Sequence, residues 1–172
     1  FANGVQWTKD LGADNYNLPD YWNWHGGENN GPAGKRCKIW RLRGESHSTL
    51  IVDPDSQFEF DPFEEAKLIR TESKARGSIA VIDSTNVHRG KVQSAQRGAY
   101  FTDERRSLVI RDEVIMTKPG KLYWHMMTGQ NARLSDDGKS VIISENGNHE
   151  NYVTLEFICD ADYELTIGPG RP

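Results

Sequence analysis

The chain alternates between short apolar runs and clusters of turn-forming residues. The runs are rich in valine, isoleucine, threonine and aromatic residues, and they are bounded by glycine, asparagine, aspartate or proline. This combination is typical of β-strands joined by tight turns. The runs that predict strands are 48–52, 57–60, 66–72, 77–83, 91–101, 105–116, 120–128, 131–135, 140–145, 152–158 and 163–167.

Helical periodicity is almost absent, and only the stretch 61–70 has a composition that allows one or two helical turns. Asp136-Asp137-Gly138-Lys139 predicts a hairpin turn, and Lys118-Pro119-Gly120 predicts another turn. Many short strands at this spacing predict an all-β fold, an antiparallel β-sandwich with little helix, in a single domain over residues 1–172. Because the opening residues 1–7 resemble the middle of a strand, we expect the chain to be a fragment of a larger protein.

The segment 12–36 departs from this pattern, because it is rich in glycine, asparagine and aromatic residues and shows no strand alternation. A loop of this length is uncommon unless it binds a ligand or covers a partner surface. Its aromatic side chains are suited to stacking on sugar rings and equally to packing against another domain. The aromatic residues are Tyr16, Tyr21, Trp22 and Trp24.

Composition and charge narrow the class of protein. Hydrophobic residues make up 36% and charged residues 27% of 172 positions, which is ordinary for a globular protein with its own core. A net charge of −4 argues against a general nucleic-acid binder, although local positive charge can still attract an anionic ligand. No apolar run approaches the roughly 20 residues that a membrane span needs. We therefore expect neither nucleic acid nor membrane as a partner.

The two cysteines, Cys37 and Cys159, are too few for a disulfide framework and lack the spacing of metal ligands. We interpret them as two free, partly buried thiols, with a long-range disulfide as the alternative. Cysteine usage therefore does not fix the redox compartment.

Positive charge gathers just before the first clear strand. The lysines and arginines within positions 35–43 are Lys35, Arg36, Lys38, Arg41 and Arg43. In an unbulged strand, residues two positions apart share one face. The residues on that face would be Arg41, Arg43, Glu45 and His47. Such a face is suited to be a cationic floor for an acidic sugar, because guanidinium matches carboxylate geometry, and equally to be a solvated face with Arg–Glu pairs.

The histidines give no self-contained metal motif, since no two of them are spaced as HxH or HxxxH. They are His25, His47, His88, His125 and His149. His47 lies in a Ser-His-Ser-Thr run at a strand start, which favours a hydrogen-bonded or ligand-binding side chain over a deeply buried one. Asp10 taken alone is a turn or strand-end carboxylate. From the residues alone, the chain is an antiparallel β-domain with a basic strand and a histidine at its end.

Two motifs extend this interpretation. The segment GVQWTKDLGADNYNLPDYW at 4–22, followed by RLRGESHSTLIVDPD at 41–55, resembles the C-terminal domain of heparinase II/III-type polysaccharide lyases. Two further segments, 92–98 (VQSAQRG) and 108–114 (LVIRDEV), resemble sequence motifs of the same family, so the resemblance covers essentially the whole chain. The first two motifs together carry most of its specificity.

The resemblance implies a two-part enzyme in which a C-terminal β-sandwich closes one side of a cleft in an N-terminal α/α-toroid. The implied reaction is β-elimination on a uronic-acid polysaccharide, in which a base removes the C5 proton and an acid protonates the departing O4. The toroid would be this chain's own partner domain, and the substrate would be an acidic polysaccharide. Because the implied catalytic groups lie outside the chain, we expect it to be inactive alone, with no catalytic residue of its own.

The resemblance also implies a metal site. The family uses a histidine upstream of the "G-V-x-W" motif, the aspartate of "W-x-x-D-L-G" and the histidine of "H-[NS]-T-L"; the last two match Asp10 and His47 here. A carboxylate oxygen and an imidazole nitrogen are normal ligands of zinc. We therefore expect zinc, or another divalent metal, in the intact parent and not in this fragment, with Arg41 and Arg43 contacting the acidic substrate.

An alternative from a different class is a non-catalytic carbohydrate-binding or structural β-sandwich module, because a fold does not settle a function. The resemblance further implies a periplasmic or secreted location. The sugar itself, whether heparan sulfate-like, alginate-like or another uronan, stays open.

Overall fold

The computed structural model describes residues 1–23, 34–53 and 60–170. Nine β-strands form the framework of the described residues, and no α-helix forms among them. The strands are β1 (Leu50–Val52), β2 (Lys67–Lys74), β3 (Gly77–Asp83), β4 (Val92–Thr102), β5 (Ser107–Met116), β6 (Leu122–Trp124), β7 (Asn131–Leu134), β8 (Ser140–Glu145) and β9 (Asn148–Glu156). Short 3-10 turns connect them at η1 (Gly34–Lys38), η2 (Trp40–Leu42), η3 (Gly44–Ser46), η4 (Thr85–His88) and η5 (Asp103–Arg105).

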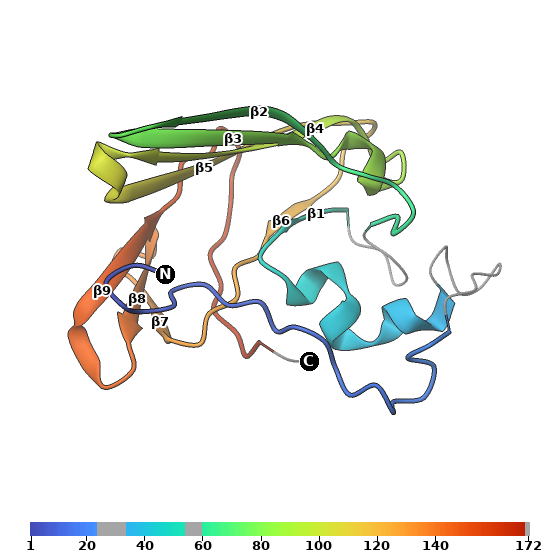
Figure 1. Cartoon of the computed structure of the whole chain (residues 1–172), viewed down its shortest axis with the longest axis horizontal. Helices are drawn as coiled ribbons and strands as arrows, with labels where there is room; N and C mark the ends of the chain where they lie inside the picture. The colour runs from blue at the N-terminus through green and yellow to red at the C-terminus, as the bar shows by residue number, and fades with distance from the viewer. Residues whose placement is uncertain (24–33, 54–59, 171–172) are drawn as a thin grey trace.

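The strands form three antiparallel sheets that give a sandwich-like β fold. One sheet has the order β2-β3-β4-β5, a second has the order β7-β8-β9, and a third pairs β1 with β6. In Figure 1 the four-stranded sheet is the upper layer, the β7–β9 sheet lies below it at one end, and β1 and β6 run between them. This confirms the predicted all-β, antiparallel fold.

Two apolar clusters hold the layers together. One joins the buried Val5 and Trp7 of the N-terminal segment to Ile143 of β8, and apolar side chains of β7 and β9 pack around it. The other joins Val52 of β1 to Val92 and Ala95 of β4. The N-terminal segment therefore covers one face of the β7–β9 sheet, and β1 packs against the four-stranded sheet.

Most strand predictions are confirmed, since β3 spans 77–83 as expected and β4, β5, β7 and β8 agree within two residues. The hairpin turn at Asp136–Lys139 is confirmed, with Ser135 donating its N–H to Ser140 at 2.9 Å. The predicted strand 57–60 lies almost entirely outside the described residues.

Three local predictions are wrong. Residues 1–7 do not form the middle of a strand, because Asn3 and Gly4 adopt positive φ angles and turn the chain so that Ala2 bridges Val5. The stretch 61–70 contains no helical turn and instead leads into β2. No strand forms at 163–167, because none of the described strands pairs with these residues.

No disulfide joins Cys37 to Cys159, so the disulfide alternative is wrong. Cys37 is half-buried, and this burial raises the pKa of its thiol. Cys159 is exposed, which differs from the expectation of a partly buried thiol. Among the described residues, no helix combines the length and apolar character required to cross a membrane.

Candidate functional site

The candidate site is built where three segments that are distant in sequence lie side by side. The backbone N–H of Lys9 donates to the carbonyl of Met127 at 2.8 Å, and the Met127 N–H donates to Ser48 Oγ at 3.0 Å. The His125 N–H donates to the Thr49 carbonyl at 2.8 Å. The segment that follows β6 therefore lies between the residues before Asp10 and the residues that enter β1.

This arrangement brings together the two residues that the sequence singled out. The Nδ1–H of His47 donates to Oδ2 of Asp10 at 2.6 Å, across 37 positions of sequence. The Asp10 side chain is 64% exposed and that of His47 is 33% exposed, so the pair lies at the surface. Two hydrogen bonds lower the pKa of the Asp10 carboxyl below its ordinary value. The bond from His47 contributes most, and the bond from the Gly12 N–H at 2.7 Å contributes next. Asp10 is therefore a carboxylate at neutral pH, with an imidazole held against it.

The predicted basic strand is wrong. Residues 40–47 form two consecutive 3-10 turns, in which the Arg43 N–H donates to Trp40 and the His47 N–H donates to Gly44, both at 3.0 Å. Arg41 and His47 therefore do not share one face of a strand. The alternation of charged residues resembles a strand in sequence, but these i→i+3 hydrogen bonds replace pairing with a neighbouring strand.

The two arginines have protein partners. Arg41 donates from Nη1 to the backbone carbonyls of Leu11 and Ala13, both at 3.2 Å, and so fastens the turn that follows Asp10. Arg43 is paired with Glu45, and its Nε donates to Glu45 Oε2 at 3.0 Å. The pairing matches the Arg–Glu alternative, but these side chains are only 25% and 16% exposed and do not lie on a solvated strand face. A contact of either arginine with substrate stays a prediction.

His125 was given no role from the sequence, yet it lies in the segment that borders the candidate pair. It is about half-buried, and this burial lowers the pKa of its imidazole, while the charge of Glu45 opposes that shift. The hydrogen bond from the His125 N–H to the Thr49 carbonyl places His125 beside the Asp10–His47 pair. No sequence motif indicates this position.

The chemistry of Asp10 and His47 fits part of a zinc site. Tetrahedral zinc with bonds of about 2.0–2.1 Å holds two ligand atoms roughly 3.3 Å apart, so Nδ1 and Oδ2 would need to separate by roughly 0.7 Å. Among residues 1–23, 34–53 and 60–170, no group of three or more His, Cys, Asp or Glu is placed to hold a metal ion. The described residues therefore supply two donors, and a third would have to come from elsewhere.

The aromatic loop has both buried and open parts. Tyr21 is 2% exposed, and its ring lies 5.0 Å from that of Tyr16 and 5.2 Å from that of Trp22. The Arg36 guanidinium lies over the Tyr21 ring at 4.3 Å. Tyr21 therefore packs inside the loop, whereas Trp22 is 62% exposed and its role stays open between stacking and packing. Trp24 and His25 lie outside the described residues.

The family comparison agrees with the fold and with the paired motifs. The chain matches the family described as "Heparinase II/III-like, C-terminal" over residues 1–170. No curated protein shows significant similarity to it. The match covers both motifs that carry Asp10 and His47, and a family with this description implies a polysaccharide lyase. The chain therefore belongs to the heparinase II/III-like C-terminal domain family.

Proposed function

We propose that this chain is the β-sandwich domain of a polysaccharide lyase that cleaves a uronic-acid polysaccharide by β-elimination. The observation that carries the proposal is the 2.6 Å contact between His47 and Asp10, which unites the two most specific motifs of the chain. The family match over residues 1–170 supplies the reaction class. Periplasmic or secreted location belongs to the same proposal, because it rests on the family alone.

The reaction divides the work between domains. Elimination needs a neutralised uronate carboxylate, a base for the C5 proton and an acid for the departing O4. In this chain, Arg41 positions the Asp10 turn through the carbonyls of Leu11 and Ala13, and Arg43 keeps Glu45 paired. We assign the base and the acid to the toroid domain, and we therefore propose that the isolated chain is inactive.

We further propose that Asp10 and His47 are two ligands of a divalent metal, most simply zinc, in the longer protein. The metal would supply a fixed positive charge that holds the 10–13 turn and the 44–47 turn together. The residues themselves already hold these turns close, because the Asp10 carboxylate accepts hydrogen bonds from His47 and from the Gly12 N–H.

The metal assignment is tested by elemental analysis of a longer protein that carries this chain joined to the toroid domain. We expect stoichiometric zinc in the wild type and loss of zinc in His47→Ala and Asp10→Asn. His149→Ala is the matched control, because His149 is exposed and lies on β9. Zinc retained by His47→Ala at the wild-type level would exclude the ligand assignment.

The lyase assignment has a separate readout. Elimination creates an unsaturated uronate that absorbs in the ultraviolet, so the rate follows from absorbance during incubation with heparin, heparan sulfate or alginate. We expect a steady rise with the longer protein and none with the 172-residue chain. An absorbance rise that scales with the concentration of the isolated chain would overturn the assignment of the catalytic groups to the toroid domain. No absorbance rise with the longer protein would favour a non-catalytic module.

A further inference from the structure

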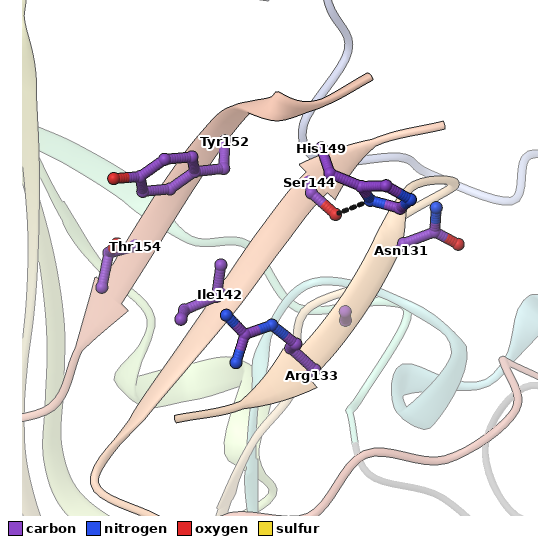
Figure 2. A pocket seen from close by; sticks show the side chains of 8 residues that line it. Asn131, Arg133, Ile142, Ser144, His149, Tyr152 and Thr154 are labelled. Carbon is purple, nitrogen blue, oxygen red and sulfur yellow. Dashed lines mark hydrogen bonds between the residues drawn. The ribbon is translucent and has the colours of Figure 1, made fainter. Parts of the chain in front are cut away.

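A hollow of about 530 Å³ lies on the β7–β9 sheet, on the face turned away from the apolar core (Figure 2). The strand register explains its lining. Asn131, Ser144 and Tyr152 form one row across the three strands, and Arg133, Ile142 and Thr154 form the next. All six side chains therefore project from one face, because residues two apart along a strand point the same way.

The alternate residues account for the opposite face. Ala132, Ile143 and Val153 form the intervening row, and Val5 and Trp7 pack against that side. The core of the domain is therefore complete without the hollow. Five of the six side chains in the two outer rows carry a polar group, so this face offers hydrogen-bonding groups to a ligand.

Arg133 provides the charge at the hollow. Among the described residues, its guanidinium makes a single hydrogen bond, a long contact of 3.4 Å from Nη1 to the Leu134 carbonyl. No carboxylate of the described chain lies within ion-pair distance of it, unlike Arg97 and Arg111, which are paired with acids in the other sheet. A guanidinium has five N–H donors in a planar fork, so Arg133 has donors available for a planar anion such as a carboxylate.

The remaining side chains suit a sugar. The ring of Tyr152 is 57% exposed on β9, and an open aromatic ring on a sheet face offers an apolar surface with a polar end. Asn131, Ser144 and Thr154 supply amide and hydroxyl groups that both donate and accept hydrogen bonds, as sugar hydroxyls do. At one end of the hollow, the His149 ring lies beside Ser144, with Nδ1 at 3.3 Å from Oγ (Figure 2).

We propose that this hollow is a second binding site, for a carboxylated saccharide, in which Arg133 holds a uronate carboxylate and Tyr152 contacts a neighbouring sugar ring. The proposal goes beyond the lyase function and does not depend on it, because the hollow shares no residue with the Asp10–His47 site. The spacing fits more than one sugar unit: Arg133 and Tyr152 are two strands and two residues apart, which corresponds to roughly 11–12 Å between Cα atoms.

The charge of the face selects among acidic sugars. The next outer row pairs Ser140 with Glu156, so a carboxylate lies at the end of the platform that carries Arg133. Glu156 lies two strands and two residues from Arg133, so it leaves the guanidinium open to one uronate group, while its charge repels the further sulfates of a densely sulfated chain. The structure therefore favours an unsulfated uronan over a heparin-like polymer at this site.

The test uses the 172-residue chain and two matched probes, tetramannuronate and neutral mannotetraose. Titration followed by ¹⁵N NMR should give saturable shifts for tetramannuronate at amides in 131–133, 142–144 and 152–154. We expect Arg133→Gln to weaken binding about tenfold or more, because a hydrogen bond to a charged group is lost. Tyr152→Ala should weaken binding several-fold, and Tyr152→Phe should retain most of it.

Arg111→Gln is the control, since it removes the same charge from an exposed arginine of the other sheet. Equal weakening by Arg111→Gln and Arg133→Gln would overturn the proposal, because it would show non-specific attraction. Equal affinity for mannotetraose, shifts centred on Asp10 and His47 instead of the hollow, or no saturation at millimolar concentration would overturn it as well. Failure of the lyase assay with the longer protein would leave this result unchanged.

Discussion

Arg97 and Asp112 form an ion pair whose contribution to the stability of the fold depends on its burial. The two residues lie opposite each other on β4 and β5, with Nε to Oδ1 at 2.6 Å and Nη2 to Oδ2 at 2.9 Å. Their side chains are only 21% and 17% exposed, because they face the side of the sheet that carries Ala95 and the apolar cluster. Removing one partner therefore leaves a charge that is largely shielded from water.

We expect Asp112→Ala to lower the free energy of unfolding by about 2–3 kcal/mol. The estimate lies between the roughly 3–5 kcal/mol measured when a fully buried pair loses one partner and the roughly 0–1 kcal/mol of a surface pair. With a urea slope of about 2 kcal/mol per M, the unfolding midpoint should fall by about 1–1.5 M. The assay is urea denaturation followed by far-UV circular dichroism.

The neighbouring residue provides the matched control. Glu113 projects from the opposite face of β5 and pairs with Arg111 at 2.8 Å, and these side chains are 61% and 77% exposed. Glu113→Ala should therefore cost less than about 0.5 kcal/mol. The double variant Arg97→Met with Asp112→Leu should recover most of the loss, because it leaves no unpaired charge. Equal midpoints for Asp112→Ala and Glu113→Ala, or no recovery in the double variant, would refute this reasoning.

Three further predictions concern the core and the candidate site. His88 is 3% exposed, and burial followed by the charges of Lys91 and Arg97 lowers its pKa below 6.5, so the unfolded chain takes up the proton first. The contribution of neutral His88 to stability should therefore be full above pH 6.5 and should be lost as the pH falls below it. Between pH 8 and pH 5, the urea midpoint should fall less in His88→Gln than in the wild type. An equal fall in both proteins would show that His88 does not cause this pH dependence. Ile143→Ala should lower the free energy of unfolding by about 2–4 kcal/mol in the same urea assay, because Ile143 is only 2% exposed. The control Ile115→Ala should lower it far less, because Ile115 is 58% exposed. Arg41→Gln should speed hydrogen exchange of the Gly12 amide several-fold without a large change in global stability, because it frees the turn after Asp10; unchanged exchange would mean that Arg41 does not position it.

The sequence predicted the fold well where each strand carries its own signals. The run 77–83 alternates β-branched and small residues after a glycine, and the structure places β3 there. The pattern predicts a strand from 152, whereas β9 begins four residues earlier, at 148. Asn146-Gly147 was the available signal, because Asn-Gly favours a two-residue hairpin turn, and Gly147 does adopt a φ of 84°. Recognising it would have placed His149 on the sheet.

Local pattern failed where the conformation depends on contacts with distant residues. The alternating charges of 41–47 are compatible with a strand, but no segment that the structure describes pairs with them, and the chain closes into 3-10 turns. The hollow on β7–β9 could not be predicted either, because it depends on the register of three strands and on which face Val5 and Trp7 cover. Such features are decided by tertiary packing, which single-sequence patterns do not encode.

The contact between Asp10 and His47 does not require a strand at 41–47. The motif resemblance specified the two residues, whereas the structure joins them through the Lys9–Met127 and Met127–Ser48 hydrogen bonds, with Arg41 fastening the turn beyond Asp10. Two side chains positioned in this way by the protein would have less conformational entropy to lose on binding the proposed metal. Of these supporting contacts, one joins two backbone groups and the others need the side chains of Ser48 and Arg41, so the pair should depend on Ser48 and Arg41 more than on other neighbouring side chains.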